Sequence, residues 1–562
     1  MTRGRKPTAR RRIAALLAAV ACACALLAGC GNDGEEFAFS VCVGDEAVTY
    51  DPIYAESAGD QTVIAHLYEN LMRLTENPDG TLSVTGGAAQ SVDVRENGDG
   101  TVNYTFHLRE TEWSDGMALR AADFVYAWQR LADPASASPY AALLSIVSGY
   151  DAARATGDMD LLAVTEKNNR TLVVTLDGHY DWFLREVCTS PATVPLRREV
   201  VQRLKHVAEE RNEKNEGEDN RWWFDPTLLV TNGPYRATAA GEGYLKLTRN
   251  THYAGRTRGA DVLTFCFADA EGAQALYADG TVQLCAPTPE ETMRERAEKD
   301  ETWAAEPLLE TYCVLFNGNR VTDPRVRAAM GLALDRVSLA QTMGAGAAAA
   351  EGLVPPCVPQ GDGTFRENGK LLIDNHPETY EARCEEARTL LAQAEQDDWE
   401  RTDLEYLYEE GGGRDALATA LCKTWSEVLH LRVTPSPLPK QELMSALREG
   451  KYTLAGLGVS AVCCEAECFL MNWTSESGEN LIAYENSAYD TLMSIIAAAA
   501  DGSARMGCLH DAEELLVKID SAICPVCTEG TAWELRAEYV GARRDARGWF
   551  DLTEVKARPN NL

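Results

Sequence analysis

The residues between 87 and 131 constrain the fold more than any other part of the sequence. Apolar and polar residues alternate over 102–108, which is the pattern of a β-strand with one buried face. The turn sequence Asn97-Gly98-Asp99-Gly100 precedes this strand, so the region predicts a β-hairpin. Asp123 follows as the expected N-cap of a helix that contains 124–128.

Strand and helix patterns continue to alternate along the rest of the chain. Short apolar runs predict strands over 171–176 and 244–248. Apolar residues at helical spacing predict helices over 325–337, 380–396, 416–429 and 503–519. No internal repeat stands out, and the alternation predicts the α/β class.

Length and charge limit what the chain can do. Its 562 residues, 45% of them hydrophobic, exceed what one core usually serves, so we expect two to four lobes. The formal net charge of -33 comes from 53 basic and 86 acidic residues that are spread along the chain. Such a surface repels nucleic acid and anionic lipid headgroups, which excludes both as partners.

The first thirty residues have the features of an export signal. Six basic residues within 3–12 precede an uncharged apolar run over 13–28, which is too short for a comfortable membrane span. The run ends in Leu27-Ala28-Gly29-Cys30, which resembles the lipobox of bacterial lipoproteins. We therefore expect Cys30 to carry the lipid and become the new N-terminus, with residues 31–36 as a tether. An ordinary secretory signal with an incidental cysteine is the alternative.

Cysteines are frequent for an exported chain of this length. Of seventeen, Cys22 and Cys24 leave with the signal and Cys30 is lipidated, so fourteen remain. We expect most of these to be buried thiols, including Cys524 and Cys527 on a strand. A disulfide or a metal site between Cys463 and Cys468 is the alternative for the one dense cluster.

Several motifs together resemble one known family. In chain order they are Tyr50-Asp51-Pro52, Leu67-Tyr68-Glu69-Asn70-Leu71, Asn103-Tyr104-Thr105-Phe106-His107-Leu108-Arg109, Trp113-Ser114-Asp115-Gly116, Asp123-Phe124-Val125-Tyr126-Ala127-Trp128-Gln129-Arg130, Ala137-Ser138-Pro139-Tyr140, Thr231-Asn232-Gly233-Pro234-Tyr235 and Asp323-Pro324-Arg325-Val326-Arg327. In this order and spacing, the chain resembles the extracytoplasmic solute-binding proteins of ABC importers, of the oligopeptide-binding (family 5) type. The resemblance covers nearly the whole mature chain.

The resemblance implies a type II periplasmic-binding-protein fold of the α/β class, in which two lobes enclose the ligand and a third lobe is inserted. The implied divisions are 1–29 signal peptide, 30–36 tether, 37–68 lobe I, 69–190 lobe II, 191–310 lobe I again, 311–528 lobe III, and 529–562 the last part of lobe I. Trp113 and the helix after Asp123 are then packing elements of lobe II.

The resemblance also implies where the ligand lies. In this family a bound peptide is held as an added β-strand by two segments of the protein, through main-chain hydrogen bonds. One segment maps to Glu56, Ser57 and Ala58. The second segment maps to Gly456, Gly458, Val459 and Ser460, where glycines fit a close approach of backbones.

One departure from the family pattern affects the ligand directly. Family members carry an Asp that pairs with the ammonium of the peptide, and ungapped matching places Val462 there. A buried ammonium without a partner is costly. Either Glu465, Glu467 or Glu56 therefore takes this role, or the ligand has no free amine at that point. Cys463 and its neighbours fill this region, as a disulfide, as buried thiols, or as a soft-metal or haem-linked site.

Enzyme functions find no support in the sequence. It has no Gly-x-Ser-x-Gly elbow, no His-Glu-x-x-His and no Walker loop, and its eight histidines are scattered. We therefore expect no catalysis, no cofactor and no metal. The expected function is that of a monomeric lipoprotein, anchored outside the cytoplasm on the cell membrane, that captures oligopeptides by hinge closure and delivers them to an ABC permease. A metal chelate, haem or modified peptide as ligand, or a peptide-sensing receptor without transport, are the alternatives.

Overall fold

The computed structural model describes ten stretches of the chain, and these form two compact units. The stretches are 36–44, 49–77, 82–214, 221–255, 257–286, 303–344, 346–361, 363–411, 413–498 and 502–558. Unit 1 holds the described residues up to 286 together with 533–545 and 549–558; unit 2 holds those from 303 to 532 together with 546–548. The predicted signal, Cys30 and the tether up to 35 lie outside the described residues.

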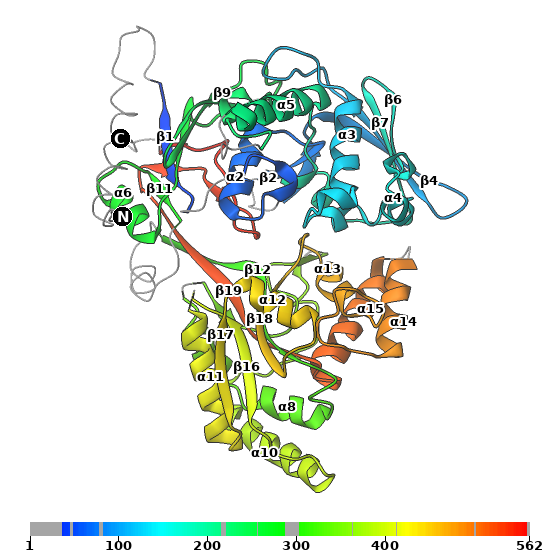
Figure 1. Cartoon of the computed structure of the whole chain (residues 1–562), viewed down its shortest axis with the longest axis vertical. Coiled ribbons are helices and arrows are strands. Elements are labelled where there is room, and N and C mark those ends of the chain that lie inside the picture. The colour runs from blue at the N-terminus through cyan, green and yellow to red at the C-terminus, as the bar shows by residue number, and fades with distance from the viewer. Residues whose placement is uncertain are drawn as a thin grey trace. The chain divides into compact units, whose positions relative to one another are not determined.

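A mixed sheet forms the base of unit 1 (Figure 1). Its strands are β1 (Ala38–Cys42), β8 (Tyr235–Gly241), β9 (Tyr244–Arg249), β10 (Val262–Cys266) and β11 (Leu284–Cys285). Strand β1 lies in the middle and pairs in parallel with β10 and β11, while β9 pairs antiparallel with β10 and β8. The sequence predicted β9 but missed β8, which follows the turn at Asn232-Gly233-Pro234 directly.

The predicted hairpin is confirmed as part of a second, four-stranded sheet in unit 1. Its order is β4 (Ala89–Glu96), β5 (Val102–Leu108), β7 (Thr171–Leu176) and β6 (Val164–Asn168). Every second side chain of β5 is buried, as the alternation requires.

Helix α3 (Ala121–Ala132) corrects one expectation. Asp123 is not its N-cap: the helix begins three residues earlier than expected, with Arg120 as the cap residue. The Asp123 carboxylate instead accepts from the N–H of Arg120 at 2.9 Å and from the indole of Trp113 at 3.2 Å. Trp113 is fully buried, which confirms its role in packing.

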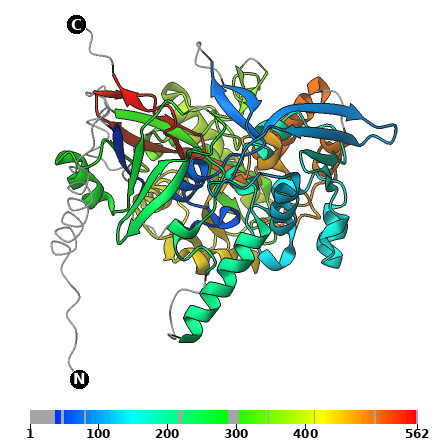
Figure 2. The ribbon, with the colours of Figure 1, turned by 90° about the horizontal axis from the view of Figure 1, so that it is seen from above.

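The remaining elements of unit 1 are four α-helices and three short antiparallel strand pairs in the described residues. The helices are α2 (Ala58–Leu67), α4 (Tyr150–Thr156), α5 (Arg198–Lys214) and α6 (Ala270–Ala278); the short antiparallel pairs are β2 (Met72–Glu76) with β3 (Leu82–Gly86), β20 (Tyr539–Val540) with β23 (Lys556–Ala557), and β21 (Arg543–Arg544) with β22 (Phe550–Asp551). Figure 2 shows α5 extending from the body of unit 1, in agreement with its largely exposed residues.

The strands of unit 2 lie in the order β17-β16-β18-β12-β19, within the same 11-stranded sheet that holds β11, β1, β10, β9 and β8. The strands are β12 (Trp303–Phe316), β16 (Leu404–Glu409), β17 (Val433–Leu438), β18 (Leu454–Ser460) and β19 (Ile523–Leu535), with the short β13 (Ala348–Ala349) against β19 and the separate pair β14 (Pro359–Gln360) and β15 (Gly363–Thr364). Strand β19 continues into unit 1, where its last residues pair with β11.

Helices cover both faces of the unit 2 sheet (Figure 1). One face packs Tyr312 and Tyr406 against α8 (Pro324–Leu332), α9 (Arg336–Ala340), α10 (Tyr380–Gln396) and α11 (Arg414–Leu429), which contributes Trp425. The other face packs against α12 (Lys440–Arg448), α13 (Ala466–Leu470), α14 (Ser487–Ala498) and α15 (Gly502–Glu514). Both faces are apolar, so each buries a core of its own.

Most predicted helices of unit 2 are confirmed, with one break. Asp323 caps α8 by accepting from the N–H of Arg325 at 2.8 Å. The single helix expected over 325–337 is two helices, because Asp335 caps a new helix, α9, by accepting from Ser338. Local capping by Asp335 thus ends an apolar periodicity that would otherwise continue.

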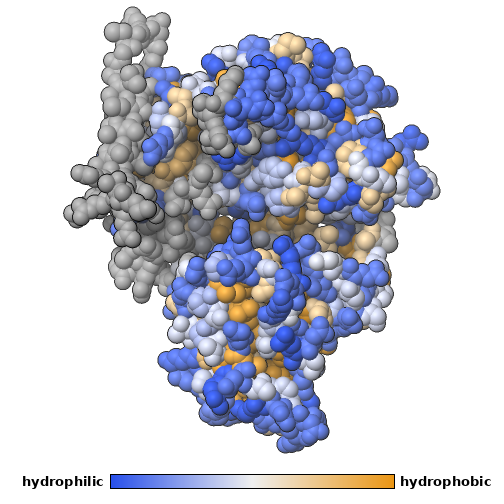
Figure 3. Space-filling model, in the orientation of Figure 1, coloured by the Kyte–Doolittle hydropathy of each residue, from blue (hydrophilic) through white to orange (hydrophobic). Residues whose placement is uncertain are grey.

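The surface agrees with the acidic composition. Polar residues cover most of the face drawn in Figure 3. Among the helices of the described stretches, none combines the length and the apolar character that crossing a bilayer requires. The finer division into lobes remains a prediction.

Asp51, from the first of the motifs, is a buried carboxylate of unit 1 that accepts from two side chains. It is 1% exposed and accepts from both terminal nitrogens of Arg130 on α3, at 2.6 and 2.5 Å. The indole of Trp222 donates to the same carboxylate at 2.8 Å. Three segments far apart in the sequence are therefore joined at one buried ion pair.

We expect Asp51→Asn to lower the free energy of unfolding by about 3 to 5 kcal/mol, because it leaves the Arg130 charge buried without its partner. Glu110→Gln is the matched control, since Glu110 pairs with Arg170 while its side chain is 87% exposed. That change should cost less than about 1 kcal/mol. Denaturant unfolding followed by circular dichroism measures both, and equal losses would contradict the assignment.

Candidate functional site

The predicted second ligand segment lies on β18, and one edge of this strand is open. Strand β12 pairs with β18 along its whole length, from Leu454 to Ser460. On the other edge, β16 pairs only with Leu454 and Ala455. Over 456–460, no strand of the described part of the chain pairs with this second edge. Its main-chain groups are therefore free to pair with an added strand.

In the structure, the glycines of β18 make room for other side chains of the protein. A Cβ on Gly456 would lie 2.0 Å from the Tyr312 hydroxyl and 2.1 Å from that of Tyr406. A Cβ on Gly458 would lie 1.8 Å from Oε1 of Glu310. Side chains of the protein itself thus occupy the space above both glycines. Whether a ligand backbone also approaches these glycines remains a prediction.

The other predicted residues of this segment contribute mainly their backbone. Val459 is 8% exposed, and its side chain packs in the core beneath the sheet. Ser460 is exposed and Val462 is half-buried. A ligand along this edge would meet peptide groups and few side chains, which favours recognition that is independent of ligand sequence.

Three carboxylates gather around one arginine at the same end of β18. Arg414, the first residue of α11, lies 3.8 Å from Glu310, 3.4 Å from Glu409 and 3.2 Å from Glu529. The four side chains keep between 17 and 28% of their surface exposed. One positive charge against three carboxylates leaves the cluster net negative.

The pKa of the Glu310 carboxyl group is raised above its usual range. Burial, and then repulsion from Glu529, raises the pKa of Glu310 to about 8, although Arg414 and Lys440 oppose this. Its carboxyl group therefore keeps its proton to a higher pH than an ordinary glutamate does. A cation placed beside it would favour the ionised form, since an opposite charge stabilises a carboxylate.

The sequence did not single out Glu310, Arg414 or Glu529. They come from three separate segments, and only the pairing of β12 with β18 brings Glu310 beside Gly458. The one available signal was the position of Arg414 directly after three glycines at the end of an apolar strand, where ligands bind in many α/β sheets.

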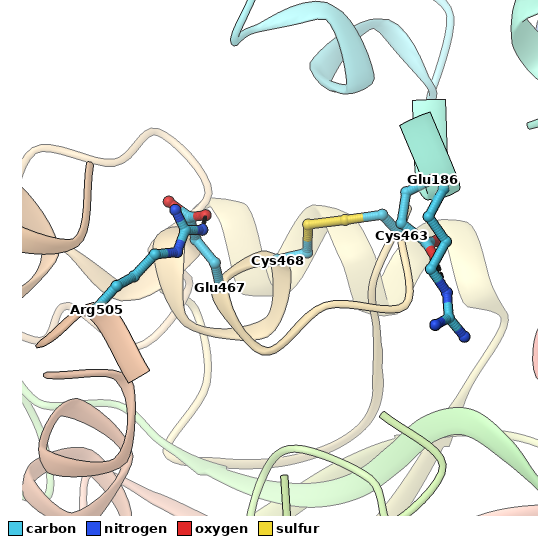
Figure 4. The surroundings of a disulfide bond; sticks show 6 residues. Glu186, Cys463, Glu467, Cys468 and Arg505 are labelled. Atoms are coloured by element: carbon cyan, nitrogen blue, oxygen red, sulfur yellow. Dashed lines mark hydrogen bonds and ion pairs between the residues drawn. A yellow bond between two sulfur atoms is a disulfide. The ribbon is translucent and has the colours of Figure 1, made fainter. Parts of the chain in front are cut away.

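The cysteine cluster is settled as a disulfide. Cys463 and Cys468 are joined, which takes away the two thiolates that a soft-metal site would use (Figure 4). Between them, Glu465 lies at the N-cap position of α13. Glu467 pairs with Arg505 of α15, so Glu467 is already neutralised and is a poor partner for an ammonium.

The other cysteines confirm the expectation of thiols. In the stretches that the structure describes, twelve cysteines lie outside the disulfide, and ten of them are buried, including Cys524 and Cys527 on β19. Burial raises the pKa of the Cys527 thiol well above its ordinary value, so it is a poor metal ligand or nucleophile. Within the described stretches, no group of three or more His, Cys, Asp or Glu side chains has the geometry to hold a metal ion.

The first predicted segment lies in unit 1, at the start of α2. Ser57 is the N-cap and accepts from the N–H of Asp60 at 3.0 Å, and Ala58 is the first helical residue. Glu56 is exposed before the cap. Its role toward a ligand, like that of Ser57 and Ala58, remains a prediction.

Comparison with known proteins gives a consistent result. Residues 83–480 match the model of the family described as "Bacterial extracellular solute-binding proteins, family 5 Middle". The chain is 28% identical to the periplasmic oligopeptide-binding protein OppA of Salmonella typhimurium over 500 residues, which cover 86% of this chain and 85% of OppA. It is 27% identical to the probable deoxycholate-binding periplasmic protein YgiS of Escherichia coli, with 88% of each chain covered.

A solved structure shows the same fold. Haemophilus influenzae OppA in complex with RPPGFSPFR superposes with a TM-score of 0.71 at 23% identity, covering 94% of this chain and all of the other. This confirms the predicted class, an α/β fold of the periplasmic-binding-protein type.

We expect Gly456→Ala to destabilise unit 2 by about 1 to 3 kcal/mol, because the added methyl group meets two buried hydroxyls. Removing both hydroxyls, by Tyr312→Phe with Tyr406→Phe, should make the same glycine change cheaper. Gly478→Ala is the control, since its Cβ meets nothing within 4 Å. Thermal unfolding measures the series, and an equal cost at 456 and 478 would contradict the packing described.

Proposed function

Since this chain belongs to the bacterial extracellular solute-binding proteins of family 5, we propose that it binds oligopeptides outside the cytoplasm and delivers them to an ABC permease. Members of this family are substrate-binding proteins of transport systems and not enzymes. Closure of the two ligand-enclosing lobes on the peptide is the mechanism, and Cys30 holds the protein at the membrane.

The open edge of β18 is the observation that carries the peptide assignment. Five residues, 456–460, have a second edge that no described strand occupies. At about 3.3 Å per residue this length accommodates a short extended peptide. Glu56, Ser57 and Ala58 are proposed as the contacts from unit 1, and Ser460 and Val462 as contacts at the end of β18.

The Glu310 cluster provides a carboxylate in place of the Asp that family members carry at the position of Val462. The family's Asp is absent there, and Glu467 is bound to Arg505. Glu310 lies against Gly458 in a net negative cluster. We assign to it, with Glu529, the binding of the ligand's ammonium group. Glu310 then replaces Glu465 and Glu467 as the partner in this proposal.

Ligands other than peptides occur among the relatives, as the name of YgiS indicates. Strand addition is what separates a peptide from these alternatives, because it requires a regular series of amide groups. The decisive test therefore modifies the ligand's main chain and leaves its side chains unchanged.

We expect penta-alanine peptides with one N-methylated amide to fall into two classes. Methylation of an amide that faces β18 should weaken binding at least tenfold, since it removes a main-chain hydrogen bond and adds bulk. Methylation of the next amide along, which faces away from β18, should weaken binding less, because it leaves the hydrogen bonds to β18 in place. Isothermal titration calorimetry measures the series. Equal affinity for every methylated peptide would sink the strand-addition proposal.

We expect binding of penta-alanine with a free N-terminus to tighten between pH 5.5 and 7.5. The ammonium, with a pKa of about 7.7 to 8.0, stays mostly protonated in this range. Glu310 has its pKa raised to about 8 by burial and by Glu529, and an ammonium binds best to its ionised form, which grows as pH rises. Binding should therefore release a proton from the cluster.

Two controls isolate Glu310 in that titration. N-acetylated penta-alanine should show no such pH dependence, and Glu310→Gln should remove the dependence for the free peptide. Glu405→Gln on the neighbouring strand β16, where the side chain is exposed, should behave as the wild type. A pH dependence that survives Glu310→Gln would place the ammonium elsewhere.

We expect Cys30→Ser to abolish labelling of the protein with radioactive palmitate and to move it from the membrane fraction to the soluble fraction. The sequence before Cys30 supports lipidation at this residue alone. Peptide affinity should not change, because none of the proposed contacts belongs to the tether. Retained label in the variant would refute the anchor and leave the peptide proposal intact.

A further inference from the structure

Unit 1 contains a cavity that the proposed peptide function does not use. Its volume is about 700 Å³, within the range of small-molecule sites. It lies where α2, β2, the segment 189–194 and the β21–β22 hairpin meet. None of the residues proposed to contact a peptide lines it.

Most charged side chains of the lining have partners within the protein. Glu69 pairs with Arg73 at 2.5 Å, and Asp551 pairs with Arg543. Both residues of the stretch 544–545 also interact with other groups of the chain. These groups satisfy one another, so none of them calls for a ligand.

Two charged side chains of the lining differ from the rest. Arg258 and Glu554 form no hydrogen bond or ion pair with another side chain of the stretches that the structure describes. Arg258 is exposed and Glu554 is half-buried. Because both side chains line the cavity and keep exposed surface, a ligand in the cavity can reach both charges.

The backbone brings Arg258 and Glu554 close together. The N–H of Gly259 donates to the carbonyl oxygen of Thr553 at 2.8 Å, and a Cβ on Gly259 would lie 2.7 Å from the same oxygen. Arg258 directly precedes Gly259, and Glu554 directly follows Thr553. A positive and a negative charge thus start from adjoining backbone, beside one cavity, without pairing with each other.

The apolar part of the lining is suited to a hydrophobic body. It includes Met72, Leu74, Leu82, Pro191 and Val194. Ligand sites commonly combine such a lining with a few polar groups that fix the orientation of the ligand. A ligand that matches this cavity therefore carries one carboxylate and one ammonium close together, and an apolar body beyond them.

We propose that this cavity is a second ligand site of the protein, separate from the peptide segments, and that it takes an amino acid with a large apolar side chain. The α-carboxylate accepts from the guanidinium of Arg258, and the α-ammonium donates to the carboxylate of Glu554. The side chain of the ligand packs against Met72, Leu74 and Val194. Hydrogen bonds between charged groups of this kind are stronger than those between neutral groups.

The test is calorimetric titration of the whole mature protein with L-phenylalanine and with two derivatives that each lack one charge. Phenylalanine should bind saturably. Phenylalaninamide, which lacks the carboxylate, and N-acetylphenylalanine, which lacks the ammonium, should each bind about fivefold more weakly or worse.

Two variants assign each charge of the ligand to one residue. Arg258→Gln should weaken phenylalanine about fivefold or more and leave phenylalaninamide unchanged, because the amide has no carboxylate for Arg258 to hold. Glu554→Gln should weaken phenylalanine and leave N-acetylphenylalanine unchanged for the corresponding reason. Leu74→Trp should block all three ligands by filling the cavity.

Arg236→Gln is the matched control, because Arg236 is also an exposed arginine of unit 1 but does not line the cavity. It should leave the affinity unchanged, and none of the four variants should alter penta-alanine binding. The proposal is overturned if phenylalanine does not saturate the wild type, if both derivatives bind as tightly as phenylalanine, if Arg258→Gln weakens phenylalanine no more than Arg236→Gln does, if Leu74→Trp binds normally, or if penta-alanine displaces phenylalanine. Since the readout is phenylalanine, failure of the peptide proposal leaves this test interpretable.

Discussion

The unequal pairing of β18 is the constraint on which the rest of this account depends. A strand inside a sheet normally has a neighbour on both edges, yet β16 leaves β18 after Ala455 while β12 stays with it to Ser460. Five residues of main chain therefore keep donors and acceptors on one side without a strand partner in the described residues. An open edge of this kind is a liability for a soluble protein unless a ligand uses it.

The surroundings of this edge are closely packed. Helices pack on both faces of the sheet, and the Tyr312 and Tyr406 hydroxyls meet at 3.1 Å above Gly456. After the strand, the Cys463–Cys468 disulfide closes the loop before α13. The glycines thus allow the protein's own side chains to pack over the strand. A pre-formed edge lowers the entropy lost when a peptide is ordered on it.

The sequence predicted the parts of the fold that depend on local pattern. The alternation over 102–108 predicted β5, and apolar spacing predicted α10 and α11 closely. It failed where one side chain decides the position of a helix end. Asp123 lies inside the first turn of α3 and accepts from the backbone of the cap residue, and Asp335 starts a second helix within one apolar pattern. Strand β8 was missed because small and polar residues fill most of it.

The candidate site was predictable only as far as the resemblance extended. The segment on β18 and the absence of Asp at Val462 follow from matching motifs. The Glu310 cluster does not, since its members come from β12, α11 and β19 and meet only in the folded sheet. Pairing of the Cys463 thiol was left open in the same way, because spacing alone does not separate a disulfide from a metal site.

The most direct test of the account is hydrogen–deuterium exchange of the β18 amides with and without a saturating peptide. Strand addition predicts that exchange over 456–460 slows strongly when the peptide binds, while the β12 amides, already paired, change little. If the protein is saturated with peptide and those amides exchange as fast as before, the open edge is not where the ligand binds.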